Sequence, residues 1–442
     1  MATTYLSRAA TDFGTATNRK KCTISFWLKR ASLTVQQAVM GVETTPAGGT
    51  SEARFILRGD DTLEFYDYQS GYKFRYITNR LFRDTSAWYN IVLAVDTTHP
   101  TGSERVKIYI NGIQETSFSS STDPAQDLDT FINSGNYLQI GRQSTGNSYL
   151  NGSLSHYNFI DGTTYDATAF GSTDSITGEW KIKTSPSVTY GTNGFFILKN
   201  GNSVTDASPN TNNFTIGVGA GGGLSKTEDN PSNNFCTWNP NYRGTRKDMT
   251  LTNGNTFIFE QNSGDSAVSG SIAVSSGKYY WEQIIAQVDG TNAAVAGAMH
   301  STEDWNVTPE EVYGNNNTFG VRSNGNAYLN GTNLGSVTAA TYNGDVLGIA
   351  FDADNGNMYL WRNGAAQNSG NAIITGIDTT KTWVPFGVQH GGARVTTSTN
   401  FGNGYFQNNP VSSAGTNASG NGIFEYDVPT GYTALSTKGL NL

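Results

Sequence analysis

Residues 91–114 read IVLAVDTTHPTGSERVKIYINGIQ, and residues 346–367 read VLGIAFDADNGNMYLWRNGAAQ. In both stretches an apolar strand ends in Asp, a polar turn follows, and a second strand ends at an Asn-Gly pair. Asn-Gly favours a two-residue type I′ turn, because that turn needs positive φ at both positions, which Asn tolerates and Gly adopts freely. We therefore expect hairpin turns at Asn111 and Asn363, each in a β domain of its own.

The composition supports this all-β interpretation. A chain of 442 residues exceeds what one hydrophobic core usually organises, and domains of roughly 100 to 200 residues suggest two or three units. Only 14% of the residues are charged, and 51 Gly interrupt short runs of β-branched and aromatic residues. This texture is typical of strands joined by tight turns. No long stretch has the spacing of an amphipathic helix, so helices should be few and short.

Charge, termini and cysteines exclude several classes of protein. The formal net charge of -8 provides no clustered basic surface, so neither DNA nor RNA is expected as a ligand. The N-terminal stretch MATTYLSRAATDFG has no apolar signal-peptide core, and no run of 18 apolar residues occurs, so no membrane insertion is expected. Two cysteines, Cys22 and Cys236, are too few for a disulfide framework and should be free thiols.

Changes in composition divide the chain into three stretches. Residues 1–171 are dense in strand patterns, residues 172–241 are rich in Gly, Asn, Thr and Pro, and residues 242–442 return to strand patterns. The middle stretch is the expected linker, with the boundary inside its glycine run. It also holds two strand-like segments, 194–199 and 212–218, which are expected to add to the first domain.

Strand patterns within the first domain predict how individual residues are oriented. In the strand 22–28, Ile24 and Phe26 should face one side and Trp27 the other. Residues 91–95 are apolar throughout, as expected for a strand that is covered on both faces.

Several motifs of the first domain occur in the order seen in a known family. They are TISFWLKR (23–30), DTSAWYNIVLAVD (84–96), RVKIYINGIQ (105–114), YLQIGR (137–142) and NGSLSHYNFIDG (151–162). Residues 4–171 thereby resemble the laminin G and concanavalin A-like lectin family. The resemblance implies a jelly-roll β-sandwich, a fold that serves both binding and purely structural roles.

A second set of motifs follows in the last stretch of the chain. They are SGKYYWEQII (276–285), NGDVLGIAFDAD (343–354), MYLWRNG (358–364) and WVPFGV (383–388). Residues 242–442 thereby resemble a SPRY (B30.2) domain. The resemblance implies a bent β-sandwich that binds proteins or glycans.

No catalytic motif accompanies either resemblance. Glucanases with a concanavalin A-like fold usually carry E-x-D-x-x-E on one strand, and this chain lacks it. No pair of carboxylates is expected on facing strands, and neither a G-x-S-x-G elbow nor a P-loop is present. We therefore expect a protein that is not an enzyme and that requires no cofactor.

One acidic segment, STDPAQDLD, offers candidate metal ligands. Laminin G-like sandwiches often hold a calcium ion at their rim, and Asp123, Asp127 and Asp129 are spaced so that their oxygens can reach one hard cation. The alternative is a solvated acidic loop.

Two aromatic groups are candidates for ligand binding. Trp305 lies in the polar segment STEDWNVTPEEVYG with Tyr313 nearby, where an exposed Trp would be a binding anchor; the alternative is a loop that packs beneath its own Trp. The second group is Tyr66, Tyr68, Tyr72 and Tyr76, in a tyrosine-rich pair of strands. Period-2 geometry puts Tyr66 and Tyr68 on one side of their strand, so one face of this hairpin should be exposed or at an interface.

The combination of a lectin-like sandwich, a Gly/Asn-rich linker and a SPRY-like domain resembles virion surface proteins of tailed bacteriophages. It implies a structural protein that is made in the bacterial cytoplasm and assembled into the virion with other virion proteins. We expect either a receptor-binding tail component or a capsid decoration that contacts a host surface glycan, with a homotrimer as the expected oligomer. The alternatives are a free carbohydrate-binding protein and a glycan hydrolase on a concanavalin A-like fold.

Overall fold

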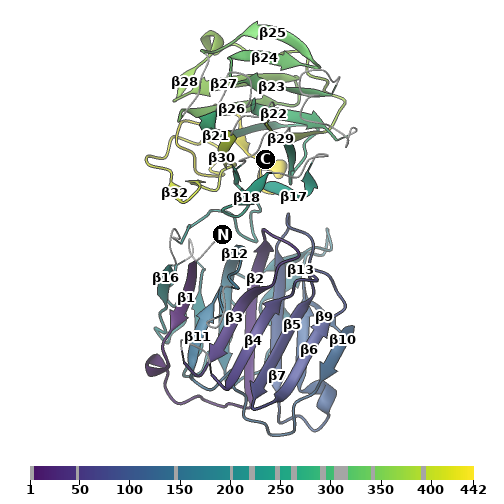
Figure 1. Ribbon diagram of the computed structural model, residues 1–442, viewed down its shortest axis with the longest axis vertical. Coiled ribbons are helices and arrows are strands. Elements are labelled where there is room, and N and C mark those ends of the chain that lie inside the picture. The colour runs from purple at the N-terminus through teal and green to yellow at the C-terminus, as the bar shows by residue number, and fades with distance from the viewer. Residues whose placement is uncertain are drawn as a thin grey trace. The chain divides into compact units, whose positions relative to one another are not determined.

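The computed structural model describes residues 4–45, 49–143, 148–199, 203–218, 224–243, 249–259, 266–288, 295–302, 317–339, 344–389 and 395–442. The chain forms two compact units, Met1–Lys226 and Thr227–Leu442 (Figure 1). Both units consist of β-strands, so the all-β prediction is confirmed. The helices in these ranges are single 3-10 turns, none long and apolar enough to cross a membrane: η1 (Ala10–Asp12), η2 (Gly102–Glu104), η3 (Ala167–Ala169), η5 (Asn368–Gly370) and η6 (Gly439–Asn441).

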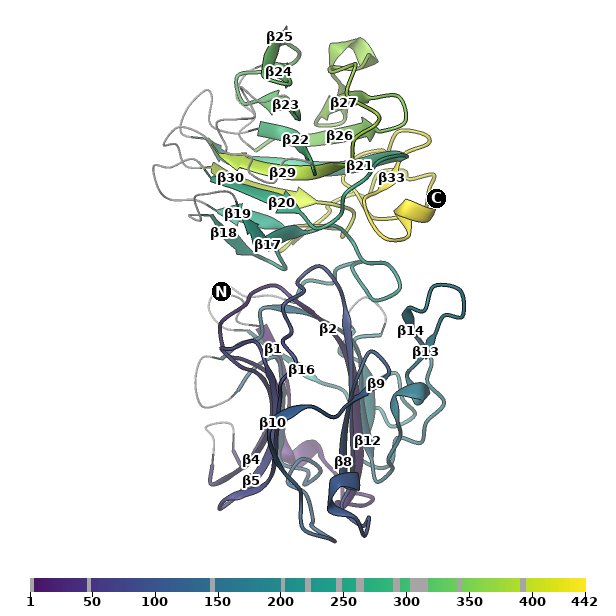
Figure 2. The ribbon, with the colours of Figure 1, turned by 90° about the vertical axis from the view of Figure 1, so that its right-hand side faces the viewer.

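The first unit is a sandwich of two antiparallel sheets that face each other (Figure 2). In its described residues, the larger sheet has eight strands in the order β10 (Phe118–Thr122), β6 (Tyr72–Thr78), β5 (Leu63–Gln69), β4 (Ser51–Leu57), β3 (Gln37–Glu43), β11 (Tyr137–Ile140), β1 (Thr4–Arg8) and β16 (Thr215–Val218). The smaller sheet has six, in the order β15 (Phe195–Ile197), β12 (Gly152–Asp161), β2 (Lys21–Arg30), β7 (Tyr89–Asp96), β8 (Val106–Ile110) and β9 (Ile113–Glu115).

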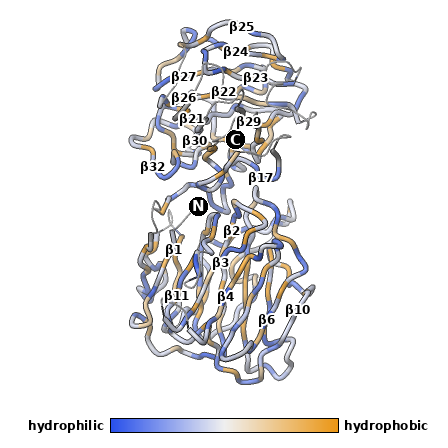
Figure 3. Tube along the Cα trace, in the orientation of Figure 1, coloured by the Kyte–Doolittle hydropathy of each residue, from blue (hydrophilic) through white to orange (hydrophobic). Residues whose placement is uncertain are grey.

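Aromatic side chains fill the space between these two sheets. Phe26 of β2 meets Phe55 of β4 edge to face, with ring centroids 5.3 Å apart. Phe65 and Phe74 continue the row along the larger sheet, with centroid separations of 5.5 and 5.3 Å. All four rings are completely buried. Alternation along each strand sends every second residue into this core, and Figure 3 shows apolar residues concentrated along strands such as β2 and β3.

Strand β7 is covered on both faces, as its continuous apolar sequence predicts. Ile91, Leu93 and Val95 belong to the main core, whereas Val92 packs on the opposite side in a second cluster that includes Phe196. The hairpin of β13 (Gly171–Thr173) and β14 (Trp180–Ile182) lies beside that second cluster, and Trp180 packs against it.

The turn between β8 and β9 has the predicted type I′ character. Asn111 has φ of 49° and Gly112 has φ of 81°. The indole of Trp180 covers this turn, since a Cβ built on Gly112 would lie 2.4 Å from the ring. Trp180 Nε1 donates a hydrogen bond of 2.9 Å to Asn90 Oδ1, which holds the ring in place.

Segments 194–199 and 212–218 supply the edge strands β15 and β16. Strand β15 pairs with β12, and β16 pairs with β1, so both sheets of the first unit take up chain from beyond residue 171. The compact unit accordingly continues to Lys226. The two cysteines are buried thiols that form no disulfide, as predicted.

The second unit is also a sandwich. Across its described residues, one sheet runs β17 (Trp238–Arg243), β20 (Ser266–Gly270), β29 (Trp383–Gln389), β22 (Val295–Ser301), β23 (Thr318–Arg322), β24 (Asn326–Leu329) and β25 (Thr332–Ser336). The other runs β18 (Thr250–Thr252), β19 (Phe257–Phe259), β30 (Val395–Asn400), β21 (Lys278–Val288), β26 (Val346–Asp352), β27 (Asn357–Arg362) and β28 (Ala365–Ala366), and β33 (Thr433–Ala434) pairs with β21. Two short strands, β31 (Tyr405–Phe406) and β32 (Asn409–Pro410), pair with each other and form a separate small sheet.

Three tryptophans, Trp238, Trp281 and Trp383, are buried in the second core. The turn after β27 repeats the geometry of the first unit, with φ of 48° at Asn363 and 77° at Gly364. Both hairpin turns expected from the two Asn-Gly steps are therefore present.

One carboxylate, Glu282 of β21, is completely buried in the second unit. Its oxygens accept hydrogen bonds from the backbone N–H groups of Glu425 (2.8 Å) and Tyr426 (2.9 Å) and from the hydroxyl of Tyr280 (3.2 Å). Burial raises the pKa of Glu282 to about 7, although these three donors act in the opposite direction. The carboxylate thus ties β21 to the C-terminal segment.

The Gly112 turn is expected to tolerate no side chain. A Gly112→Ala substitution combines positive φ with a clash against Trp180, whereas Gly178, with φ of 74°, has no atom within 4 Å of its virtual Cβ. We expect Gly112→Ala to lower the free energy of unfolding of the first unit by about 1–3 kcal/mol more than Gly178→Ala does. Urea unfolding followed by hydrogen–deuterium exchange of β8 measures both, and equal losses would contradict the packing argument.

Glu282 is expected to make the stability of the second unit depend on pH. The pKa of Glu282 in the folded state, about 7, lies above the ordinary glutamate value of 4.5, so the folded state binds a proton more tightly than the unfolded state does. The resulting contribution to stability is fully present below pH 4.5 and is lost as the pH rises through 7. The free energy of unfolding should fall by up to about 3 kcal/mol across that window. Urea titrations at pH 4.5 and 7.5 test this, with Glu282→Gln as the comparison. If the free energy of unfolding of Glu282→Gln fell by the same amount between pH 4.5 and 7.5, the pH dependence would belong to other groups.

Candidate functional site

The residues singled out in the sequence are placed unequally. Trp305 and Tyr313 lie outside the described residues. Tyr66 and Tyr68 of β5 lie with Tyr72 of β6 on the outer face of the eight-stranded sheet, which is turned toward the viewer in Figure 1. Tyr76 contradicts the prediction, because it points into the core and contacts Phe118 edge to face at 5.3 Å. A register shift in the β5–β6 pairing reverses the alternation of β6 after Tyr72.

The three candidate calcium ligands have separate environments. Asp123 accepts a 2.6 Å hydrogen bond from the hydroxyl of Tyr76, and Asp127 forms an ion pair of 3.1 Å with Lys20. Asp129 is exposed. Among the described residues, no three His, Cys, Asp or Glu side chains form a group that could hold a metal ion. The structure therefore does not bring these aspartates together, and calcium binding stays a prediction.

The outer face of the eight-stranded sheet carries a row of polar and aromatic residues across five strands. Directly opposite Cα partners share a face, and the pairings run in sequence across β11, β3, β4, β5 and β6. The row consists of Tyr137, Glu43, Glu52, Tyr68 and Tyr72. Neighbouring strands are about 4.8 Å apart, so the row spans about 19 Å. We call it the tyrosine–glutamate row.

Two carboxylates face each other within this row, contrary to the prediction that no such pair exists. Glu43 and Glu52 are paired across β3 and β4. Like charges in such positions repel, and Arg54 offsets the repulsion by pairing with both. Its Nη2 lies 3.2 Å from Glu43 Oε1 and also contacts Glu52 Oε2. No local sequence pattern indicates this pair, because only the register of β3 and β4 brings the two glutamates together.

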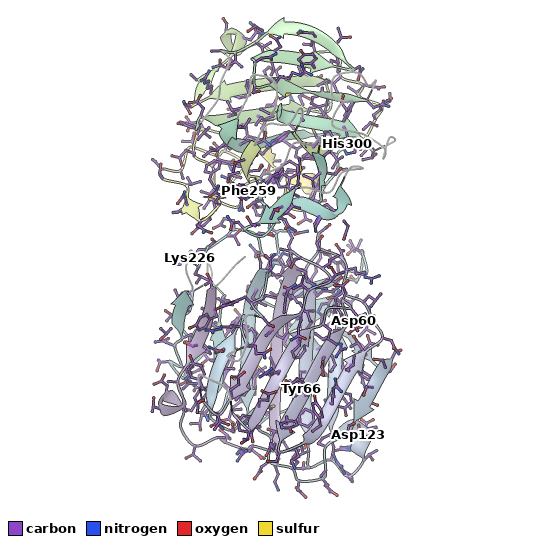
Figure 4. The ribbon with its side chains drawn as sticks, viewed as in Figure 1. Asp60, Tyr66, Asp123, Lys226, Phe259 and His300 are labelled. Carbon is purple, nitrogen blue, oxygen red and sulfur yellow. The ribbon has the colours of Figure 1, made fainter. Side chains whose placement is uncertain are left out.

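The tyrosines cluster at the β5–β6 end of the row. The Tyr72 ring meets Tyr66 and Tyr68 edge to face at 5.4 and 5.3 Å, and the guanidinium of Arg75 lies 4.9 Å from its centroid. The Tyr66 hydroxyl donates a 2.7 Å hydrogen bond to Glu52 Oε1. Burial is the main cause that raises the pKa of Tyr66, and this hydrogen bond raises it further. Figure 4 shows Tyr66 on the face of the sheet and Asp123 toward the lower end of the first unit in that view.

Exposure separates the three tyrosines by role. Tyr66 is only 6% exposed, Tyr68 is half-buried, and Tyr72 is 50% exposed. The expected exposure of this face therefore holds for Tyr68 and Tyr72 but is wrong for Tyr66. Tyr66 supports the exposed ring of Tyr72 from beneath and fixes the position of Glu52.

A second aromatic group on the same sheet was missed in the sequence. The guanidinium of Arg142, which follows β11, lies 4.7 Å from the ring centroid of Tyr5 and 5.2 Å from that of Tyr149. Gln139 shares the outer face with Ser7 of the neighbouring strand, between this group and the tyrosine–glutamate row. Arg142 and Tyr149 form a local β-bridge, whereas Tyr5 is distant in sequence and is brought to them by the pairing of β1 with β11.

This arrangement provides the two kinds of contact that a saccharide requires. Tyr68 and Tyr72 present aromatic surface to the apolar face of a sugar ring, and Glu52 lies beside them as a hydrogen-bond acceptor for hydroxyl groups. Trp27, Trp88 and Trp281 of the strand motifs are buried and not available for this purpose, whereas Trp361 is half-buried.

Comparisons with known proteins agree with the fold of the first unit. Residues 3–168 match the model of the concanavalin A-like lectin/glucanases superfamily. The match covers most of the first unit and is consistent with its two-sheet sandwich. No curated protein matches the chain.

Solved structures that resemble the chain include three of different kinds. The SPRY domain of human HERC1 shares 18% identity over 37% of this chain and 96% of its own, with a TM-score of 0.31. Domain 4 of AbnA, an extracellular arabinanase from Geobacillus stearothermophilus in complex with arabinotriose, shares 17% identity over 33% of this chain and 63% of its own, with a TM-score of 0.24. The LG1-3 region of the laminin α2 chain shares 10% identity over 89% of this chain and 60% of its own, with a TM-score of 0.31. The chain thus spans less than two thirds of the last two structures.

Arg54 is expected to be essential for the stability of the tyrosine–glutamate row. Arg54→Met leaves Glu43 and Glu52 facing each other without a cation, and removing one partner of a buried pair typically costs about 3–5 kcal/mol. Adding Glu52→Gln should restore part of this loss, because it removes one of the two charges. Hydrogen–deuterium exchange of β4 during urea unfolding measures the effect.

Lys20→Met is the matched control for Arg54→Met. It breaks the exposed pair with Asp127, whose loss should cost no more than about 1 kcal/mol. Equal effects of the two substitutions would show that Arg54 does not compensate the facing glutamates.

Proposed function

We propose that this protein is a non-catalytic adhesion protein that binds a polysaccharide through the tyrosine–glutamate row. The observation that carries the proposal is the exposed ring of Tyr72, supported by Tyr66 and Tyr68 and adjoining the carboxylate of Glu52. The match of residues 3–168 to a superfamily of lectins and glucanases supports a carbohydrate as the ligand class.

The shape of the row favours an extended ligand. Its residues cross five strands, and Tyr137, Glu52, Tyr68 and Tyr72 are at least partly exposed, so a linear glycan can contact several of them at once. Tyr68 and Tyr72 lose little side-chain entropy on binding because they already contact each other. Preorganisation of this kind suits an adhesion protein, in which affinity comes from repeated weak contacts.

The facing glutamates favour binding over hydrolysis. A retaining glycosidase needs two carboxyl groups that both reach the scissile bond, one as acid and one as nucleophile. Here Glu43 is only 1% exposed, and both glutamates point their oxygens at Arg54. Glu52 also accepts the hydroxyl of Tyr66. Side chains engaged in this way position a surface rather than attack a substrate.

The sequence resemblance supports a location on the surface of a tailed-bacteriophage particle. In this proposal the protein is made in the bacterial cytoplasm, assembles with other virion proteins, acts as a homotrimer, and contacts a glycan of the host surface. Peptide mass spectrometry of purified particles tests this location. If the protein were absent from the particles but still bound a glycan, a free carbohydrate-binding protein would be favoured instead.

Tyr72→Ala should abolish most binding to bacterial surface glycans. Loss of the exposed ring is expected to raise the dissociation constant at least tenfold, which corresponds to a loss of about 1.4 kcal/mol of binding free energy. An array of capsule and O-antigen oligosaccharides identifies the ligand, and calorimetry compares the variants. Ile113→Ala, which removes an exposed side chain from the other sheet, is the control and should bind as the unaltered protein does.

The same experiment includes a turnover measurement. Incubation of the bound oligosaccharide with the protein should release no new reducing ends. Release of reducing ends that disappears in Glu52→Gln would replace adhesion with hydrolysis as the function of this face.

A further inference from the structure

The second unit contains a pocket of about 660 Å³ between the end of β27 and the C-terminal segments 413–416 and 425–430. This volume lies within the range of ligand pockets, roughly 300–1,000 Å³. We propose that the pocket is a second saccharide-binding site, which accepts a neutral sugar. Its ligand class rests on the function proposed above, but its residues belong to a different unit from the tyrosine–glutamate row.

The walls of the pocket are held together by a ladder of hydrogen bonds. Gly415 N donates to Phe424 O at 3.0 Å, and Val428 N donates to Thr416 O at 2.8 Å. Both the backbone N–H and the hydroxyl of Thr416 bind Asp427 Oδ1, at 2.7 and 2.8 Å. The two segments therefore form a defined wall.

A buried carboxylate anchors this wall to the sandwich. Glu282 of β21 accepts hydrogen bonds from the backbone N–H groups of Glu425 and Tyr426, the residues that begin the second lining segment. The ring of Tyr426 then packs on the β27–β28 turn, since a Cβ built on Gly364 would lie 2.6 Å from it. The position of Tyr426 is fixed from both its backbone and its ring.

Two aromatic rings and two carboxylates line the space. Trp361 and Tyr426 are both half-buried, so each buries one part and leaves another accessible. Glu425 and Asp427 each bind a neighbouring residue, Ser412 and Thr416 respectively. An ionised carboxylate has about four acceptor sites, so hydroxyl groups of a ligand can still be accepted. Rings for an apolar sugar face beside acceptors for its hydroxyls are the chemistry that a saccharide requires.

Charge narrows the ligand class. The residues that line the pocket include Glu425 and Asp427 and neither Lys nor Arg. Anionic ligands are therefore repelled, whereas a neutral sugar pays no such electrostatic cost. An organic cation is the competing occupant, because it would be attracted by the same carboxylates and rings. The hydroxyls of Ser413, Thr416 and Thr430 along the wall favour the polyhydroxylated ligand.

The test compares glycan-array profiles of the full chain and three variants. Glycans that bind the pocket should be lost, with at least tenfold weaker binding, in Tyr426→Ala and several-fold weakened in Asp427→Asn. They should be retained in Tyr72→Ala, which affects only the row of the first unit. Ile423→Ala is the matched control, because Ile423 is an exposed neighbour of the wall that does not line the pocket. Circular dichroism and thermal unfolding verify that each variant is folded.

Two results would overturn the proposal. One is an array on which every bound glycan depends on Tyr72 and none on Tyr426. The other is that calorimetry detects binding of tetramethylammonium, that Tyr426→Ala removes this binding, and that no neutral glycan depends on Tyr426. That result would identify a cation site. Glycans that depend on Tyr426 but not Tyr72 would support this pocket even if the proposed function of the row fails. Tyr426→Phe, which keeps the ring, should preserve binding if the ring face is the contact.

Discussion

The contact of phenylalanine rings between the two sheets of the first unit determines what its outer surface can be. Phe55, Phe65 and Phe74 must all point inward to meet one another and Phe26. Because side chains alternate, a slip of one residue in any strand would move the charged residues of the larger sheet into the core. The register that buries the rings is thus the same register that aligns Tyr68, Tyr72 and the two glutamates on the other face.

The alignment creates an electrostatic problem that a single residue resolves. Glu43 and Glu52 are opposite each other because their neighbours on each strand face inward, and Arg54 lies on the same face to pair with both. The compensation recurs beside it, where Glu64 pairs with Arg58 and Arg75, each at 2.7 Å. The outer face therefore remains polar and ordered without a ligand, and Tyr72 rests on a surface whose charges are already paired.

Local signals were sufficient to predict much of this architecture. Asn-Gly steps identified both hairpin turns, and the unbroken apolar run at 91–95 identified a strand covered on both faces. Tyr76 was misplaced because a register shift between β5 and β6 reverses its direction, and such an irregularity leaves no mark in an alternating sequence. The Glu43–Glu52 pair depends on the register of β3 and β4, and the contact of Tyr5 with Arg142 depends on the pairing of β1 with β11, neither of which a local sequence pattern shows.

The two candidate surfaces rely on the same physical device in different units. Tyr66 binds Glu52 and supports the ring of Tyr72, while Glu282 binds the backbone of Tyr426 and supports its ring. In each case a carboxylate that is already hydrogen-bonded fixes an aromatic ring, so little conformational entropy is left to lose when a ligand arrives. Within the row of the first unit, Tyr68 and Tyr72 already contact each other, so a ligand that reaches one ring is held at a high effective concentration near the other.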